Sequence, residues 1–289
     1  MLTVASGLAS ALGYAVHDYL LVRIVRSASL WTALLWVMFV GLALLLPLAL
    51  IVDGIPSGEE QWRAAAFAAG SGVLELLGLG ALLKGLATGN LSVVTPLGSL
   101  GGGFAAIGAI LLGEALPPVA WIGLPLAVAG GLMASIERGA DGPLGASRRT
   151  RATAGAGWAL LSAALFAGTF LFFAEATALP PFSLAAIGRT ATCVIIVPVA
   201  LLSGGLVLPR GLRRRAAVAG AVDAAAFVAL AVAVSLGPVA IASVAVAQAG
   251  TWAVILGLVV LRERLSRVQL TGVVFTCIAV TLLAVAGLE

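Results

Sequence analysis

The sequence has few charged residues, a single histidine and two cysteines. Only 10% of its 289 residues are charged and 62% are hydrophobic, whereas roughly a quarter of an ordinary soluble domain is charged. So few charges cannot cover the surface of a water-soluble protein of this length, and the composition indicates an integral membrane protein. The 16 basic residues exceed the 12 acidic ones. This excess is what orientation in a membrane requires, and it needs no nucleic-acid partner.

The scarcity of reactive side chains also argues against enzymatic activity. With His17 as the only histidine, a histidine-rich metal site is excluded, and no GxSxG, P-loop or HExxH pattern occurs. Cys193 and Cys277 each lie in an apolar run, where we expect unreactive packing thiols. The sequence therefore predicts no enzymatic activity, no metal site and no cofactor.

Long apolar runs dominate what is present. A membrane-spanning helix needs about 20 apolar residues, and ten such runs occur, separated by turn residues and charges. They cover roughly residues 2–22, 29–52, 62–86, 90–112, 116–136, 152–174, 181–203, 214–236, 238–261 and 267–287. The first run lacks a preceding basic segment, so we expect a membrane helix there and not a cleaved signal. The predicted fold class is an all-α membrane protein with ten transmembrane helices.

The two halves of the chain repeat one pattern. Residue 89 corresponds to residue 237, a shift of 148 (237 − 89). The second half then contains one inserted residue, after which the shift is 149 (257 − 108). Five identities follow at this second shift: Gly108/Gly257, Glu114/Glu263, Leu116/Leu265, Val119/Val268 and Gly123/Gly272. Five spans per half is an odd number, so the second half must enter the membrane from the opposite side. We therefore predict two inverted five-helix repeats around a central cavity, residues 1–136 and 152–289, joined by a polar linker at 137–151.

The loop charges predict the orientation. Arg63 and Arg189 lie elsewhere, but the other 14 basic residues (16 − 2) lie in or beside the loops that follow spans one, three, five, seven and nine. The positive-inside rule places those loops, including the linker 137–151, in the cytoplasm and both termini outside. We expect a multi-pass protein of the cell inner membrane, as a monomer or homodimer.

Two acidic residues lie deep in predicted spans. Glu75 is near the centre of the third span and Asp223 is within the eighth, and their separation (223 − 75 = 148) equals the repeat shift. An ionisable group at this depth costs about 2.5–3.5 kcal/mol on insertion scales and is a functional candidate by default. We expect the two acids to face each other across the repeat axis and to exchange protons. The alternative is that each bonds to serine or backbone groups and only pins helix packing.

Two other charged positions leave alternatives open. Arg189 lies about six residues into the seventh predicted span. It either forms a salt bridge with Glu175 across the preceding hairpin or clamps a substrate carboxylate, which a guanidinium fits bidentately. His17 and Asp18 lie about five residues before Arg23, where we expect a solvated or helix-end role. A proton relay through His17 is the alternative.

Several uncharged residues complete the predicted site. Ser99 and Gln248 are repeat counterparts at the shift of 149 (248 − 99) and are polar at the depth of a cavity. Trp252 and Phe227 can line an apolar pocket, although buried aromatics more often belong to the core. The predicted substrate-binding residues are Glu75, Asp223, Ser99, Gln248, Trp252, Arg189 and Phe227, and those predicted to couple protons are Glu75, Asp223 and His17.

The chain resembles the EamA-type transporters of the drug/metabolite transporter superfamily. Each half ends with a glycine-spaced helix, a Glu-x-Leu loop (Glu114–Leu116 and Glu263–Leu265) and a last helix that opens at glycine. Arg189 matches an arginine in the second helix of such a half, and Met38 occupies that place in the first half. The resemblance implies export of amino acids (aromatic ones included), other metabolites or drugs through a cavity formed mainly by spans 1, 3, 4, 6, 8 and 9. Some relatives use a membrane glutamate for proton coupling. Many members are thought to keep both termini inside, the opposite of what the loop charges predict here.

The leading hypothesis is an alternating-access exporter of a small, partly apolar metabolite, foremost an amino acid, with its site between spans 3–4 and 8–9. The first alternative is a proton-coupled exporter of multiple drugs or cationic compounds. The alternative of another class is a passive channel or a structural membrane protein. A channel needs a continuous file of polar residues, whereas those of this sequence are sparse. The predicted partners are a small-molecule substrate, the lipid bilayer and protons, with no nucleic acid.

Overall fold

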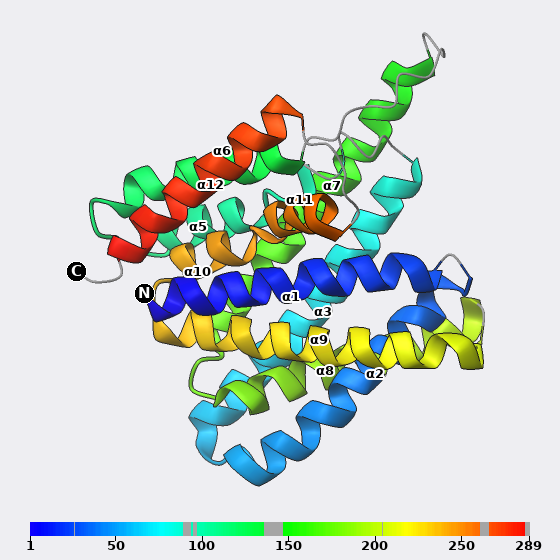
Figure 1. Cartoon of the computed structure of the whole chain (residues 1–289). Helices are drawn as coiled ribbons and strands as arrows, with labels where there is room; N and C mark the ends of the chain where they lie inside the picture. The colour runs from blue at the N-terminus through cyan, green and yellow to red at the C-terminus, as the bar shows by residue number, and fades with distance from the viewer. Residues whose placement is uncertain are drawn as a thin grey trace.

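The computed structural model describes residues 1–25, 27–88, 94, 97–135, 147–203, 205–260 and 266–286, and the regular elements of these residues are all helices (Figure 1). The helices in chain order are α1 (Leu2–Val25), α2 (Leu30–Leu48), the π-helical turn η1 (Ala49–Asp53), α3 (Gly58–Thr88), α5 (Gly101–Leu111), α6 (Ala120–Ser135), α7 (Ser147–Glu175), α8 (Pro181–Ser203), α9 (Arg210–Leu236), α10 (Val239–Val246), α11 (Ala249–Val260) and α12 (Arg267–Ala286).

Eight helical stretches are long and apolar enough to cross a membrane. Two more apolar helices, Gly101–Leu111 and Ala120–Ala134, are shorter. The fourth predicted span begins in residues outside those described. The fifth starts later than predicted, because Gly113 adopts φ 96° and α6 begins only after Pro117–Pro118. The all-helical fold is thus confirmed with eight candidate spans, and the total of ten remains a prediction.

The predicted linker is shorter at its second end. Residues 136–146 lie outside the described part, but α7 already begins at Ser147, within the predicted range 137–151. The second span also continues past Pro47 into the π-helical turn, which ends at Gly54 with φ 82°, a conformation that favours glycine. There the Oδ2 atom of Asp53 accepts a hydrogen bond of 2.7 Å from the backbone N–H of Ser183 in the first turn of α8, so a first-half loop caps a second-half helix.

Helices of the two halves pack in pairs. In Figure 1, α1 and α9 run side by side across the middle, and α6 and α12 lie together at one edge. The other close pairs are α3 with α7, α2 with α8, and α5 with α10. Each pair takes one helix from each half, and exchanging the halves turns the α1/α9 pair into the α7/α3 pair. The two repeat regions therefore interleave, and the inverted orientation of the repeats stays a prediction.

Glycines allow two further contacts between the halves, α3 with α8 and α2 with α9, to be very close. A Cβ atom on Gly72 of α3 would collide with the carbonyl group of Gly188 in α8, and one on Gly220 of α9 would lie 2.5 Å from the Val37 carbonyl oxygen in α2. The two crossings correspond to each other, since 220 − 72 = 148 and 188 − 37 = 151. Small residues at such points let backbones approach closely. Each crossing lies one turn from a deep acid, so the crossings position the site.

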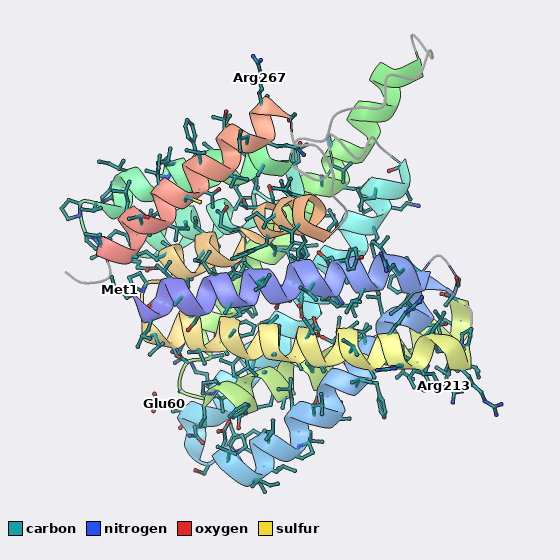
Figure 2. The ribbon with its side chains drawn as sticks, in the orientation of Figure 1. Met1, Glu60, Arg213 and Arg267 are labelled. Carbon is teal, nitrogen blue, oxygen red and sulfur yellow. The ribbon has the colours of Figure 1, made fainter. Side chains whose placement is uncertain are left out.

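The two ends of the helix bundle differ in charge. Met1 and Glu60 lie toward one end and Arg213 toward the other, where α1 ends and α9 begins (Figure 2). Arg214 and Arg215 follow Arg213 in the exposed first turns of α9. The orientation in the membrane, with both termini outside, stays a prediction.

Candidate functional site: a charged triad between the halves

Arg189 is the centre of the deepest charged cluster. Its side chain is fully buried in α8, and Nη1 donates a hydrogen bond of 2.8 Å to Oε2 of Glu75. Nη2 lies 3.4 Å from the other Glu75 oxygen and 2.9 Å from Oδ2 of Asp223. The guanidinium also lies 3.9 Å above the ring of Phe227, a cation–π distance. We call Glu75, Arg189 and Asp223 the charged triad.

The triad shows the partners of the predicted charged residues. The two deep acids share Arg189 as a partner, so they do not bond only to serine or backbone groups, and their exchange of protons stays a prediction. The predicted Arg189–Glu175 bridge is wrong. Glu175 ends α7 at the surface and lies 3.5 Å from Arg63, and both side chains are exposed, whereas Arg189 points inward to α3 and α9.

The triad retains unused bonding capacity. Two carboxylates surround one guanidinium, which leaves one surplus negative charge when all three groups are ionised. Asp223 Oδ2 and Arg189 Nε have no hydrogen bond of good geometry among the described residues, although Oδ2 is within ionic contact of Nη2. Buried charges need such partners. Glu75 is 14% exposed and Asp223 only 2%, so Glu75 is the more accessible acid of the triad.

Helix α1 adds two polar rings to the edge of the triad. His17 is only 4% exposed, which corrects the expectation of a solvated position, because α1 packs along α9 and turns this face inward. Tyr14, which the sequence reading missed, lies three residues earlier on the same face. The charges of Asp223 and Arg189 act on both side chains. The spacing of three residues between Tyr14 and His17, which places both on one helix face, was the signal available in the sequence.

Gln248 lies in a separate polar cluster. Its side chain is 2% exposed, and its Nε2 donates to the carbonyl oxygens of Ala127 and Val244 at 3.2 and 3.1 Å. Its Oε1 accepts hydrogen bonds from Thr251 and Thr276 at 3.1 and 3.2 Å. All four bonding positions of the amide are thus used within the protein, and they tie α10 and α11 to α6 and α12. A direct substrate contact of Gln248 remains a prediction.

Two-residue turns interrupt both helical regions that carry the predicted polar pair. One turn is at Ser99–Leu100, before α5, and the other at Ala247–Gln248, between α10 and α11. They lie within one residue of equivalent places, since Ser99 corresponds to Gln248 at the shift of 149 (248 − 99). Ser99 and Trp252 are partly buried beside these turns, and Phe227 is fully buried against Arg189. Discontinuous helices are typical of substrate sites in transporters with internal repeats.

Comparison with known proteins assigns the chain to a family. The model of the EamA-like transporter family matches residues 1–136 and 153–285. The chain belongs to the EamA-like transporter family. It is similar to a solved protein crystal structure with a TM-score of 0.79 and 16% identity, covering 98% of this chain and 97% of that one, which shows a shared fold. No curated protein matches the chain.

Family membership makes this EamA-family protein a multi-pass membrane transporter that acts on a small molecule, and the family's members are transporters and not enzymes. Within the described residues, no group of three or more His, Cys, Asp or Glu side chains is arranged to hold a metal ion.

One Glu-x-Leu loop of this EamA-family protein connects the two halves. The carboxylate of Glu114 accepts hydrogen bonds of 3.3 and 3.4 Å from the backbone N–H of Ala240, in the first turn of α10. A first-half carboxylate thus caps a second-half helix, as Asp53 does for α8. Partial burial raises the pKa of Glu114, and the hydrogen bonds from Ala240 and Val239 oppose this rise. Its counterpart Glu263 lies outside the described residues.

Met38 in the first half is the repeat counterpart of Arg189 in the second half (189 − 38 = 151). Its Sδ atom lies 3.0 Å from Nη1 of Arg189. In this protein the thioether packs against the arginine that replaces it in the other half. A cation at position 38 would consequently lie within the same cluster.

Proposed function

We propose that this EamA-family protein is an alternating-access exporter that exchanges protons for a small, partly apolar metabolite with an ammonium group. An amino acid, aromatic ones included, is the first candidate. The observation that carries the proposal is the charged triad, in which equivalent acids of the two halves share one arginine. The predicted repeat regions 1–136 and 152–289 supply the two parts that move relative to each other.

The triad favours a cationic group over a carboxylate as the recognised part of the substrate. Both terminal nitrogens of Arg189 already contact carboxylates, and the face of the guanidinium lies on Phe227. A substrate carboxylate would have to displace Glu75 or Asp223. An ammonium group or a proton instead compensates the surplus negative charge, so the substrate-carboxylate clamp loses its support.

Competition for the same carboxylates would couple the two fluxes. An ammonium group at Glu75 disfavours protonation there, and a proton on Glu75 removes the charge that holds the ammonium group. The carrier would then return loaded with protons after it releases substrate. Because Glu75, Arg189 and Asp223 belong to α3, α8 and α9, a change of charge at the triad acts on both halves at once. Such differential binding is what moves a two-state equilibrium.

The second candidate function, export of cationic drug-like compounds, uses the same chemistry. The surplus negative charge beside Phe227 suits an aromatic cation as well as an amino acid. The two candidates differ in whether a substrate carboxylate is required. Phenylalanine, its decarboxylated analogue phenethylamine and ethidium therefore separate them when tested as competitors.

We further propose that the linker 137–151 is cytoplasmic, that both termini are external and that the protein resides in the cell inner membrane. The 14-to-one distribution of loop arginines and lysines supports this orientation. In a cysteine-free background, Ser147→Cys is expected to resist an impermeant maleimide in intact cells and to react after permeabilisation. Ready labelling of intact cells would reverse the orientation.

Substrate counterflow in proteoliposomes tests the function. A carrier loaded with unlabelled phenylalanine should transiently concentrate labelled phenylalanine, whereas a channel or a structural protein should not. Resistance of overexpressing cells to toxic amino-acid analogues would extend the substrate range. Counterflow with no member of the amino-acid and cation panel, with the protein folded, would contradict the proposal.

A further inference from the structure

We infer that His17 and Asp18 form a proton port that connects the charged triad to solvent at the arginine-rich end of the molecule. The inference rests on the proposed proton exchange and adds the route and the side from which protons enter. The structural observation is a buried histidine whose ring contacts an exposed carboxylate and which lies one helical turn from the level of Asp223.

The packing of α1 on α9 sets the position of the port. A Cβ atom on Gly13 would lie 2.7 Å from the Cβ atom of Ala226 and 3.5 Å from the carbonyl oxygen of Val222. Residue 13 of α1 is therefore level with the Asp223 turn of α9. Since α1 ends where the antiparallel α9 begins (Figure 1), His17 lies one turn beyond that level, toward the end that carries Arg213.

The His17 ring has one partner and one free nitrogen. Its Nδ1 lies 3.2 Å from Oδ1 of Asp18, and its Nε2 is buried without a hydrogen-bond partner among the described residues. A buried ring nitrogen without a partner is unusual. The side chain is 5% exposed, so this nitrogen is enclosed by protein and not by bulk solvent.

Asp18 connects the ring to the outside. Its side chain is 65% exposed. On a helical wheel it shares the face of Gly7, Ala11 and Tyr14, and a Cβ atom on Gly7 would lie 2.7 Å from the Cβ atom of Ala245 in α10. At Gly7 this face packs against the second half. Asp18 is therefore the point at which the His17 ring reaches the exterior of the protein.

Among the described residues, the charged and titratable groups that face His17 come from four helices. They are Asp18 and Tyr14 on α1, Asp223 on α9, Arg189 on α8 and Glu75 on α3. The sequences of α2, α10 and α11 contain no charged residue. The port therefore has one exposed acid at one end and the two triad acids at the other.

The transfer balances proton for proton. The protonated carboxyl group of Asp18 gives its proton to Nδ1 of neutral His17, and the imidazolium releases the proton that Nε2 carried to a triad carboxylate. Asp18 ends ionised, the triad acid ends neutral and the ring ends in the other neutral tautomer. Loss of the Nδ1 proton to water and uptake of a proton from water at Nε2 restore the first tautomer, so no bond other than N–H and O–H bonds changes.

A single histidine makes the port directly measurable. The ring nitrogens of 15N-histidine-labelled full-length protein in nanodiscs report only His17. We expect the titration midpoint of the ring to move by at least half a pH unit in Asp18→Asn and in Asp223→Asn, and to stay in Glu59→Gln, which removes an exposed carboxylate of α3 off this route. A wild-type ring that does not titrate between pH 5 and 9, or that ignores both substitutions, overturns the port.

Transport supplies the second measurement, with labelled phenylalanine as the probe in inverted vesicles. We expect His17→Gln to lower pH-gradient-driven uptake at least tenfold and Asp18→Asn about threefold, with Asp18→Glu restoring most of the loss. Equal driven uptake in wild type and His17→Gln contradicts the port but leaves the exporter intact. Wild-type uptake that ignores the pH gradient contradicts proton exchange itself, and the port with it. If His17→Gln does not fold, the wild-type titration and its response to the acid substitutions decide alone.

Discussion

Equivalent positions in the two halves of this transporter carry different side chains. The first half has Glu75 and Met38, and the second half has Asp223 and Arg189 at the matching places. The backbone crossings at Gly72/Gly188 and Gly220/Val37 are equivalent, so the repeat supplies one geometry twice. Only the second half supplies a cation, and that cation contacts both acids. The divergence of the halves, and not their symmetry, creates the site.

The two acids also differ in access. Glu75 makes two hydrogen bonds to Arg189 and keeps 14% of its side chain exposed. Asp223 is 2% exposed, and its contact with Arg189 is ionic without good hydrogen-bond geometry. We therefore regard Glu75 as the acid that both hydrogen-bonds the arginine and meets ligands, and Asp223 as an enclosed charge that is more weakly bonded to it. The predictions below test this division.

Moving the arginine tests the comparison most strongly. Arg189→Met leaves two buried carboxylates without a cation, and breaking such a cluster typically costs about 3–5 kcal/mol. We expect a large loss of thermal stability in detergent and no counterflow. The double variant Arg189→Met with Met38→Arg should recover part of the stability, because Met38 Sδ lies 3.0 Å from Nη1 of Arg189. No recovery in the double variant would show that the halves are not interchangeable at this point.

Neutralising each acid separately distinguishes their roles. Glu75→Gln weakens two charged hydrogen bonds, and we expect a loss of about 1.5–3 kcal/mol. Asp223→Asn removes a poorly bonded and desolvated charge, and a smaller loss is expected, since neutral replacement of such a group is often tolerated. If burial alone set the loss of stability, Asp223→Asn, at the more buried acid, would cause the larger loss. Denaturation in mixed micelles, measured on both variants side by side, determines which order holds.

Much of this architecture follows from the sequence, while the pairing does not. The apolar runs and the shift of 148 predict helices, repeats and the equivalence of Glu75 and Asp223. The partner of Arg189 was unpredictable, because the direction of a side chain depends on which helices cross, and sequence spacing favoured the neighbouring Glu175. His17 was misplaced for the same reason, since distance from Arg23 gives depth along α1 but not the buried face.

Gln248 provides a contrast to the triad. Its amide satisfies four protein groups in a region away from any charge. Gln248→Leu leaves buried hydroxyl and carbonyl groups without partners, and we expect a loss of about 1–3 kcal/mol with little change in the apparent substrate affinity. A tenfold loss of affinity at unchanged stability would instead assign Gln248 to the substrate site, as the sequence predicts.

The substitution Glu114→Gln should give the smallest change in stability. Burial raises its pKa, so the folded state binds this proton more tightly than the unfolded state does. The resulting stabilisation is complete below the ordinary value of 4.5 and is lost as the pH rises through the pKa of the folded protein. The unfolding temperature of wild type should therefore fall more between pH 4 and pH 7 than that of Glu114→Gln. If the unfolding temperatures of the two proteins fall in parallel with pH, the Glu114 carboxylate does not contribute to the pH dependence of stability.

The central claim is that Glu75 and Asp223, held on Arg189, couple transport to protons. It is tested most directly by uptake of labelled phenylalanine into inverted membrane vesicles under an imposed pH gradient, for wild type, Glu75→Gln and Asp223→Asn at equal membrane content. The account predicts that the gradient accelerates wild-type uptake and that both substitutions lower the driven rate at least tenfold. Driven uptake at the wild-type rate in both variants would contradict it and would make the triad a packing element of a facilitator.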